Sequence, residues 1–397
     1  MFNFFKKKKM TYDYKRVFLI ILDSVGTGEA KDAANFGDVG AHTLKHVIDN
    51  TEHQYKNLAK FGLFNVVNNT NFPTMGYFTK ACPISNGKDT LTGHLELMGL
   101  ITKVPFRTFT ATGFPEELIK KLEEETGRKI IGNCNASGTE IIERLGKEHM
   151  DTGSIIVYTS ADSVLQVAAH ENVVPLDELY NICEIARKLT LKDEWKVGRI
   201  IARPFIGEPG NFTRTGNRRD YALDPAGKTV LDNLKESNYN VISVGKISDI
   251  FNGKGITNSN HTNDNTEGIR TLIKKMHEEF TGLCFVNLND FDSKYGHRRN
   301  VKGYGDALRE FDEAIPHILA KLNEDDLLII TADHGNDPTF KGTDHTRENV
   351  PVFVYSNRIK KPGKLDELST FADIGATIAD NFNVDSPYGE SFLDKLK

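Results

Sequence analysis

Short, continuous apolar runs separated by helical patterns are the feature that most constrains how this chain can fold. Runs of this kind are typical of strands that are buried on both faces of a sheet. Strands that alternate with helices predict βαβ units, and therefore a mostly parallel sheet flanked by helices. The predicted strands are Val17–Leu22, Ile155–Tyr158, Val241–Val244, Leu283–Leu288, Leu327–Ile330 and Val352–Tyr355.

Helical periodicity occupies long stretches between these runs, so the sequence predicts an α/β fold. Pro316 lies inside one of the predicted helices, where its missing N–H is expected to kink the helix or to mark a break. The predicted helices are Glu116–Glu125, Leu176–Leu189, Asp306–Leu322 and Ala372–Asn381.

The length of 397 residues exceeds that of one ordinary core, so two domains are expected. Residues 14–103 and 223–397 are predicted to form one core domain, and the turn-rich residues 104–222 a smaller inserted domain. Residues 1–13 are predicted to be a disordered extension. Their lysines follow a very short apolar stretch, which is the reverse of a signal peptide.

Charge, hydropathy and cysteine content exclude several classes of protein. The net charge of -5 argues against a general nucleic-acid binder. The sequence contains no apolar run near the roughly 20 residues that span a bilayer, so no membrane partner is expected. The scattered cysteines predict free thiols and a cytoplasmic location. No heptad pattern points to an obligate protein partner. The cysteines are Cys82, Cys134, Cys183 and Cys284.

Acidic residues and histidines follow the predicted strands at the points where ligands gather in α/β sheets. Asp23 follows the first strand, Asp292 lies shortly after Leu283–Leu288, and Asp333-His334 follows Leu327–Ile330. Carboxylates beside histidines suggest a metal site. The alternative for each aspartate is a helix N-cap, which Asp also favours.

The candidate ligands separate by spacing into two groups. Asp292 and His297 are five residues apart, and Gly296 is expected to let their loop turn sharply so that both side chains converge. His345 lies eleven residues after His334, which is far enough for a loop to fold back. Two metals about 3.5–4 Å apart would clamp a phosphoryl transfer, and mixed Asp/His ligation suits Mn, Zn or Fe. The predicted groups are Asp23, Asp333 and His334 for one metal, and Asp292, His297 and His345 for the other.

Hydroxyl groups that precede a helix-like run at residues 87–99 supply a candidate nucleophile. The N–H groups at a helix N-terminus favour a phosphate, and metal coordination would activate a hydroxyl. The alternative is a simple capped helix start. Neither Thr90 nor Thr92 has the acid three residues later that a capping box requires, so this alternative is weakened but stays open.

Basic residues gather between Lys196 and Arg219, where glycines and prolines are also frequent. Arginine binds phosphate through two parallel hydrogen bonds, so the segment is a candidate anion clamp. The alternative is a charged loop that is simply solvated.

In several of its segments the sequence resembles phosphopentomutases, a family of the alkaline phosphatase superfamily. The resemblance covers about residues 14 to 397. One departure is Leu95, where family members often have Trp. The segments that carry the resemblance are Asp23–Gly28, Lys88–Glu96, Tyr158–Gln166, Arg203–Thr215 and Thr331–Thr339.

The resemblance implies an alkaline-phosphatase-like α/β core with a smaller α/β cap domain. It also implies interconversion of ribose 1-phosphate and ribose 5-phosphate, and of the deoxyribose pair. Two Mn²⁺ ions per chain, a phosphorylated Thr90 and a ribose 1,5-bisphosphate intermediate and activator would take part. The implied residues for the pentose phosphate are Ser160, Asp162, Arg199, Arg214 and Lys246. Phosphoglycerate-mutase-like or phosphomonoesterase activity on the same core is the alternative.

Overall fold

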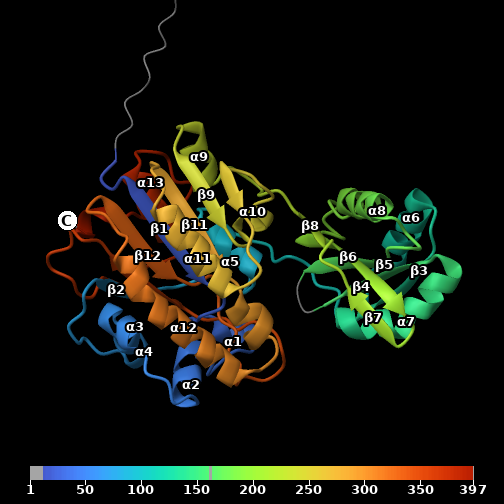
Figure 1. Ribbon diagram of the computed structural model, residues 1–397, viewed down its shortest axis with the longest axis horizontal. Coiled ribbons are helices and arrows are strands. Elements are labelled where there is room, and N and C mark those ends of the chain that lie inside the picture. Colours follow the sequence, from blue (N-terminus) through green and yellow to red (C-terminus); the bar gives the residue numbers. More distant parts are fainter. Residues whose placement is uncertain (1–11, 161–162, 397) are drawn as a thin grey trace, which may run out of the picture. The chain divides into compact units, whose positions relative to one another are not determined.

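The computed structural model describes residues 12–160 and 163–396, which divide into two compact units. The first unit comprises the described residues up to Lys103 together with those from Pro225 onward, and the second is Val104–Asp224. The predicted extension at residues 1–13 lies outside the described residues except for Tyr12 and Asp13. Both units combine a sheet with helices, which confirms the predicted α/β class (Figure 1).

A seven-stranded sheet with the order β10-β9-β11-β1-β12-β13-β2 forms the centre of the first unit. The pairs from β10 to β12 are all parallel, and β13 alone runs opposite to its neighbours. The prediction of a mostly parallel sheet is therefore confirmed. The strands are β1 (Arg16–Leu22), β2 (Tyr77–Ala81), β9 (Asn240–Val244), β10 (Asn258–Asn260), β11 (Gly282–Leu288), β12 (Asp326–Thr331) and β13 (Val350–Tyr355).

Every residue of β1, β11 and β12 is buried. Helices cover the sheet: α11 packs on β11 beside α12, whereas α9 packs on β9 and contacts α13 (Figure 1). Burial on both faces is the reason that these strands are continuously apolar. The helices are α1 (Ala33–Phe36), α2 (Thr43–Asp49), α3 (Lys56–Phe61), α4 (Leu63–Asn68), α5 (Thr90–Leu97), α9 (Val230–Glu236), α10 (Ile247–Ile250), α11 (Asn265–Met276), η1 (Phe291–Gly296), α12 (Val301–Leu319), α13 (Ala372–Asn381) and η2 (Leu393–Leu396).

Helix α12 contains Pro316, so the predicted break in the helix does not occur. The helix begins earlier than predicted, at Val301, and continues past Pro316 to Leu319. A proline in a helix leaves the carbonyl four residues earlier without its donor. Here that carbonyl belongs to Asp312 and accepts a hydrogen bond of 3.0 Å from Nδ2 of Asn57. A side chain from another part of the chain thus replaces the missing donor, so the helix does not break.

The second unit has a six-stranded sheet with the order β3-β4-β5-β6-β7, in which β8 also pairs with β6. One apolar cluster that includes Leu118, Leu179 and Trp195 lies with α6 and α8, and another that includes Ile141 and Phe205 lies with α7. The elements are α6 (Glu116–Thr126), β3 (Ile130–Asn135), α7 (Gly138–Thr152), β4 (Ile155–Thr159), β5 (Val164–His170), α8 (Leu176–Leu189), β6 (Arg199–Glu208), β7 (Asn211–Arg214) and β8 (Arg219–Ala222).

The basic segment at residues 196–219 is not a solvated loop, because most of it forms β6 and β7. Ile200, Ala202 and Phe205 of β6 are fully buried. Arg199 and Arg203 lie on one face of β6, since alternate residues of a strand face the same side. The sequence pattern was obscured by the glycines and prolines that punctuate the same stretch.

All four cysteines are free, as predicted. None of the helices in the described part of the chain is both long and apolar enough to cross a membrane.

A buried ion pair joins the first residues of two neighbouring strands and generates a prediction about stability. Nε and Nη2 of Arg16 donate to the two carboxylate oxygens of Asp326 over 2.8 and 2.6 Å. Removing one partner leaves a buried charge uncompensated, which costs about 3–5 kcal/mol. We therefore expect Asp326→Ala to lower the free energy of unfolding by about that amount in urea denaturation.

The matched control is Lys15→Ala, one residue earlier in the sequence. Lys15 forms an ion pair with Glu279 that is exposed to solvent. Exposed pairs contribute about 1 kcal/mol or less. Equal effects of the two substitutions would contradict the account.

Candidate active site

The parallel register of the central strands places the candidate residues at one edge of the sheet. Leu22, the last residue of β1, lies opposite Leu288 of β11, and Ile21 lies opposite Thr331 of β12. The segments that follow these strands therefore start side by side. Asp23 follows β1, Asp292 lies in η1 just after β11, and Asp333 follows β12. Segments that are hundreds of residues apart in the sequence thus meet at the carboxyl ends of the strands.

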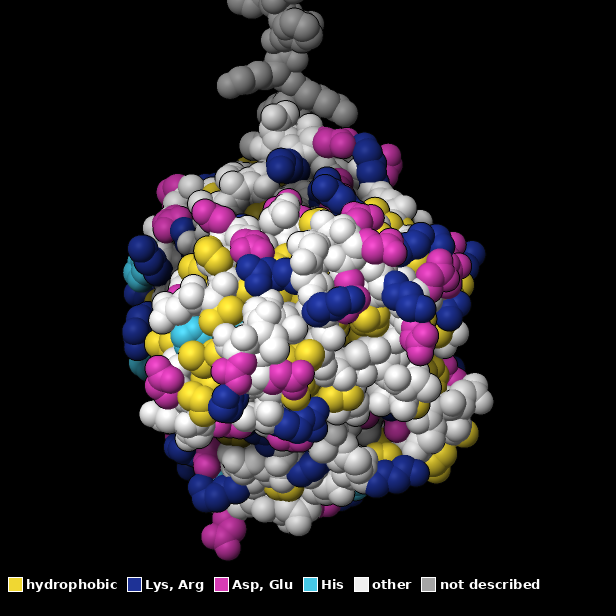
Figure 2. Space-filling model, turned by 90° about the vertical axis from the view of Figure 1, so that its right-hand side faces the viewer, with side chains coloured by type: hydrophobic (Ala, Val, Ile, Leu, Met, Phe, Trp, Pro, Cys, Tyr) yellow, Lys and Arg dark blue, Asp and Glu magenta, His cyan; other side chains and the backbone are white. Residues whose placement is uncertain are grey.

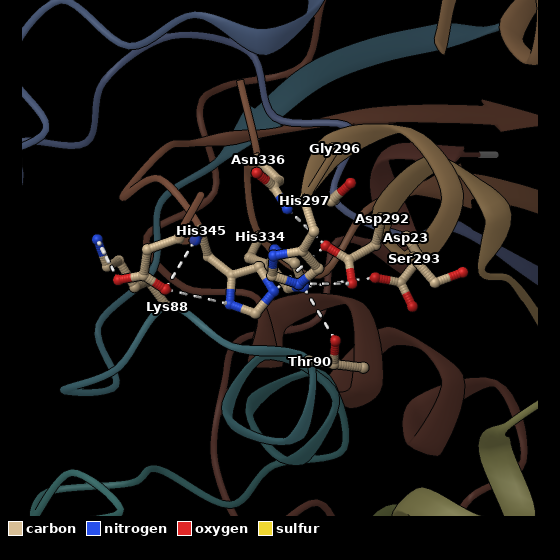
Figure 3. A network of polar contacts seen from close by, with 12 residues as sticks. Asp23, Lys88, Thr90, Asp292, Ser293, Gly296, His297, His334, Asn336 and His345 are labelled. Atoms are coloured by element: carbon tan, nitrogen blue, oxygen red, sulfur yellow. Dashed lines mark hydrogen bonds and ion pairs between the residues drawn. The ribbon is translucent and has the colours of Figure 1, made fainter. Parts of the chain in front are cut away.

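One group of candidate ligands consists of Asp292, His297 and His345, whose ligand atoms lie within 4.8 Å of one another. Nε2 of His297 lies 3.3 Å from Oδ2 of Asp292, and Nε2 of His345 lies 3.2 Å from Oδ1 of the same residue. Figure 3 shows the two imidazoles turned toward this carboxylate. The predicted triad is brought together by the fold.

Gly296 serves this group for a reason other than the predicted sharp turn. It lies at the end of η1 and is absent from the glycines with positive φ. A Cβ atom at this position would come within 2.8 Å of Cγ and Nδ2 of Asn336. Glycine is required here because the backbone approaches the Asn336 side chain closely.

A second group consists of Asp23, Asp292 and His334, again with ligand atoms within 4.8 Å of one another. Nε2 of His334 lies 3.4 Å from Oδ1 of Asp23 and 3.4 Å from Oδ2 of Asp333. Asp292 is therefore common to both groups. Asp333 lies beside the second group, and its predicted role as a ligand of that metal stays a prediction.

Each of the three carboxylates is held by an amide N–H. Nδ2 of Asn287 donates to Oδ2 of Asp23 over 2.8 Å, and Nδ2 of Asn336 donates to Oδ1 of Asp292 over 2.8 Å. The backbone N–H of Ser24, a residue with the positive φ of 73°, donates to Oδ1 of Asp333 over 3.0 Å. None of these aspartates caps a helix, so the N-cap alternative is wrong for all three. Hydrogen bonds of this kind orient metal ligands. The donors Asn287 and Asn336 carried no signal in the sequence.

The opposite oxygens of two of these carboxylates point to a metal. Oδ1 of Asp23 and Oδ2 of Asp333 are buried and receive no well-aligned hydrogen bond from any described residue. Buried charged oxygens without a partner are costly. A divalent cation would satisfy them, and the mixed oxygen and imidazole donors suit Mn, Zn or Fe. The residues present therefore fit a metal centre.

The pKa shifts of the clustered aspartates and of His334 also indicate that positive charge stabilises this site. Burial raises the pKa of Asp23, and the nearby Asp333 carboxylate raises it further. Burial raises the pKa of Asp292 as well, but His297 and His345 lower it more, so that it falls well below its usual range. Burial lowers the pKa of His334, yet Asp333 and Asp23 hold it well above its usual value. Without a cation, the carboxylates of Asp333 and Asp23 favour the protonated form of His334.

Thr90 is the hydroxyl that lies beside the histidines. Its Oγ1 lies 3.1 Å from Nε2 of His334, and Figure 3 shows the hydroxyl directed toward that ring. Thr90 is the first residue of α5, whose N-cap is Asp89. The hydroxyl of Thr92 instead donates to Asp89 over 2.6 Å, as part of the cap. The structure thus distinguishes the two threonines: the hydroxyl of Thr90 lies at the candidate site, and that of Thr92 belongs to the helix cap. The sequence alone did not decide between them.

Arg347 ties the segment before Thr90 to the segment after His345. Its guanidinium is fully buried and pairs with both carboxylate oxygens of Asp32 over 2.9 Å. It also donates to three backbone carbonyls of the segment that precedes α5, those of Pro83, Ser85 and Gly87. An arginine in a stretch of mixed polarity gives no periodic signal, so its role could not be predicted.

Glu348 packs against the two segments that carry Asp23 and Asp333. Its side chain accepts hydrogen bonds of 2.6 Å from the hydroxyls of Thr43 and Thr346. Its oxygens lie where a Cβ atom of Gly26 or Gly335 would stand, within 2.5 and 2.4 Å. Burial raises the pKa of Glu348 to about 7, although these hydrogen bonds lower it. Both glycines belong to the segments that follow β1 and β12, so Glu348 packs the two segments against each other.

The predicted substrate residues lie in both units. Lys246 belongs to the first unit and donates to Oδ1 of Asn289. In the second unit, Oγ of Ser160 accepts a hydrogen bond from Gln166, and Arg199 lies 3.8 Å from a carboxylate oxygen of Asp220. Arg214 ends β7, where it pairs with Phe205 of β6. The predicted residue Asp162 lies outside the described residues.

A comparison with protein families assigns the chain. A family described as the Metalloenzyme superfamily matches residues 15–386, nearly the whole sequence. The chain belongs to the Metalloenzyme superfamily. This membership and the two ligand groups together support the binding of divalent metals.

Solved structures that are similar to this chain have low sequence identity. The PH0037 protein from Pyrococcus horikoshii is 13% identical, with a TM-score of 0.49 over 95% of this chain and 99% of that one. A phosphoglycerate mutase from Leishmania mexicana is 11% identical, with a TM-score of 0.47 over 97% and 98%. A mutant of TAB5 alkaline phosphatase with bound Mg is 15% identical, with a TM-score of 0.38 over 94% and 99%. The activity is therefore argued from the site itself.

The position of Asp292 in both groups generates a prediction about metal binding. The wild type is expected to bind two Mn²⁺ ions, and Asp292→Asn to weaken both, because this carboxylate belongs to each group. Isothermal titration of the metal-free proteins with Mn²⁺ measures stoichiometry and affinity.

Asp290→Asn is the matched control, since Asp290 is also buried and lies two residues away. Its Oδ2 accepts from the N–H of Asn265 and from Lys294, and it belongs to neither group. This variant should bind two ions. Two tightly bound ions in Asp292→Asn would contradict the assignment.

Proposed function

We propose that this chain is a phosphopentomutase that interconverts ribose 1-phosphate and ribose 5-phosphate, and likewise the 2-deoxyribose phosphates. The observation that carries the proposal is the placement of the Thr90 hydroxyl, 3.1 Å from Nε2 of His334 and next to two groups of metal ligands. Such a constellation suits phosphoryl transfer through a phosphorylated side chain. The sequence segments shared with phosphopentomutases support the choice of substrate.

In the proposed reaction, phosphorylated Thr90 donates its phosphoryl group to the free hydroxyl of a pentose monophosphate. The bond from phosphorus to Oγ1 breaks as the bond to the sugar oxygen forms, and the proton of the sugar hydroxyl ends on Oγ1 of Thr90, which is left as a hydroxyl. The resulting pentose 1,5-bisphosphate returns its other phosphoryl group to Thr90. Thr90 is the first residue of α5, so a phosphoryl group on it would lie at a helix N-terminus, which favours negative charge.

Two divalent cations, which we propose to be Mn²⁺, would clamp the attacking and leaving oxygens of the transfer when bound. Asp292, His297 and His345 would hold one of them, and Asp23, His334 and Asp333 the other, with Asp292 also contributing to the second. A bisphosphorylated pentose is the proposed activator, because it can phosphorylate Thr90 for the first turnover.

For the sugar and its second phosphate, we propose Lys246 of the first unit with Ser160, Asp162, Arg199 and Arg214 of the second. The second unit carries positive charge on one face of its sheet, where Arg203 is largely buried. Burial lowers the pKa of Arg203 to about 10, and the nearby Arg218 lowers it too. Arginines placed close together favour a bound anion such as a phosphate.

The proposed partners are small-molecule pentose phosphates rather than nucleic acid. Figure 2 shows one face of the molecule, on which Lys and Arg side chains are interspersed with Asp and Glu. The net charge of the chain is -5. A mixed surface of this kind does not create the extended positive field that attracts a polyanion.

The same core supports a second candidate, phosphoglycerate-mutase-like or phosphomonoesterase activity. Both chemistries need the metal ligands and the hydroxyl, so the ligand groups do not separate them. The two activities differ in the acceptor of the phosphoryl group. The acceptor is a free hydroxyl of a pentose phosphate in a pentose mutase, and water in a hydrolase.

The test measures ribose 5-phosphate formed from ribose 1-phosphate by the Mn²⁺-loaded protein, with free phosphate measured in parallel. Thr90→Ala is expected to lower the isomerisation rate by at least about 10³-fold, because the phosphoryl carrier is lost. Thr92→Ala is the control, since it removes a hydroxyl of the same helix that serves only the cap. It should retain activity within about tenfold and lose about 1 kcal/mol of stability.

Release of free phosphate faster than isomer would favour the hydrolase. Full isomerisation by Thr90→Ala would show that another group carries the phosphoryl.

A further inference from the structure

We infer that His94 is a positioning residue that fixes the carboxylates of the metal centre and the start of the Thr90 helix in one arrangement. The inference rests on the metal centre of the proposed function and adds a residue that belongs to neither ligand group. His94 lies in α5, four residues after Thr90. Residues four apart in a helix lie on the same face, so the His94 ring lies on the same face of α5 as the Thr90 side chain.

Nδ1 of His94 meets two acceptors at once. It lies 2.9 Å from the backbone carbonyl oxygen of Thr90 and 3.1 Å from Oδ2 of Asp333. The carbonyl oxygen can only accept a hydrogen bond, so Nδ1 carries the proton. Oδ2 of Asp333 receives no well-aligned hydrogen bond from any described residue, His94 included, so the approach of Nδ1 over 3.1 Å is an electrostatic contact. The His94 ring thus approaches this oxygen of Asp333 from α5, and Nε2 of His334 lies 3.4 Å from the same oxygen.

Nε2 of His94 faces a different element. It lies 3.5 Å from Nδ2 of Asn287 in β11, and the same amide donates to Oδ2 of Asp23 over 2.8 Å. A neutral ring with its proton on Nδ1 offers Nε2 as an acceptor to this amide. One side chain therefore links Asp333 directly, and Asp23 through Asn287, to the helix that begins with Thr90.

The surroundings of His94 leave the ring one orientation. The side chain is fully buried, and its ring stacks on that of Phe285 with a centroid distance of 5.8 Å and an interplanar angle of 32°. Side chains that hold metal ligands in this way typically change metal affinity 10–100-fold when they are replaced.

The experiment compares Mn²⁺ affinity by isothermal titration of the metal-free proteins for three variants of His94. Asn places its amide nitrogen near the Nδ1 position and can donate to Asp333. Gln places its amide near the Nε2 position and cannot. Leu fills the space without a donor. We expect His94→Asn to bind Mn²⁺ within about threefold of the wild type, and His94→Gln and His94→Leu to bind 10–100-fold more weakly.

His149→Asn is the control for loss of a buried histidine. His149 is also fully buried, belongs to the second unit, and accepts a hydrogen bond from the N–H of His170 over 2.8 Å. This variant should lose stability and keep the Mn²⁺ affinity of the wild type. The Asn and Gln variants both lose the ring, so their comparison separates positioning from packing even if the Leu variant does not fold.

Wild-type affinity in both His94→Gln and His94→Leu would overturn the inference, as would equal losses in His94→Asn and His94→Gln. If the wild type itself bound no Mn²⁺, the metal centre would fail, and this inference would fail with it. Two ions bound by the wild type with no effect of any His94 variant would leave the proposed function intact and overturn the inference alone.

Discussion

Parallel pairing of β1 with β11 on one side and β12 on the other is the constraint on which the site depends. In this register the strands end within one residue of each other, so the segments after them emerge at one edge. Asp23, Asp292 and Asp333 meet there because their strands are neighbours and parallel. Antiparallel pairing would have placed one of these segments at the opposite end of the sheet.

The meeting of three buried carboxylates carries an electrostatic cost that the rest of the site offsets. Like charges at close range raise each other's pKa unless positive charge or hydrogen-bond donors intervene. Amides of Asn287 and Asn336 and the N–H of Ser24 supply donors, and the protonated form of His334 is favoured beside Asp23 and Asp333. A divalent cation would relieve the repulsion. Protonated His334 in the metal-free protein and the cation in the loaded protein would thus offset the same negative charge.

The sequence predicted the parts of the structure that follow from local patterns. Strands such as β11 and β12 were predictable because burial on both faces makes them continuously apolar. Asp23, Asp333 and His334 were predictable because they stand just after strands, and Asp292, His297 and His345 because of their spacing in the segments that follow. Features set by distant contacts were not. Pro316 stays inside its helix because Asn57 supplies a donor, and the supporting roles of Arg347 and Glu348 depend on loops far from them in the sequence. The short strands β7 and β8 were missed because glycines, prolines and charges hide their alternation.

The central claim is that two cations bind at the carboxyl edge of this sheet and share Asp292. Anomalous diffraction from a crystal of the Mn²⁺-loaded protein tests it most directly. The account predicts two peaks, one within about 2.5 Å of ligand atoms of Asp292, His297 and His345, and one equally close to ligand atoms of Asp23, Asp292 and His334. Ordered ligand side chains without any peak between them, or peaks only at other places in the molecule, would contradict it.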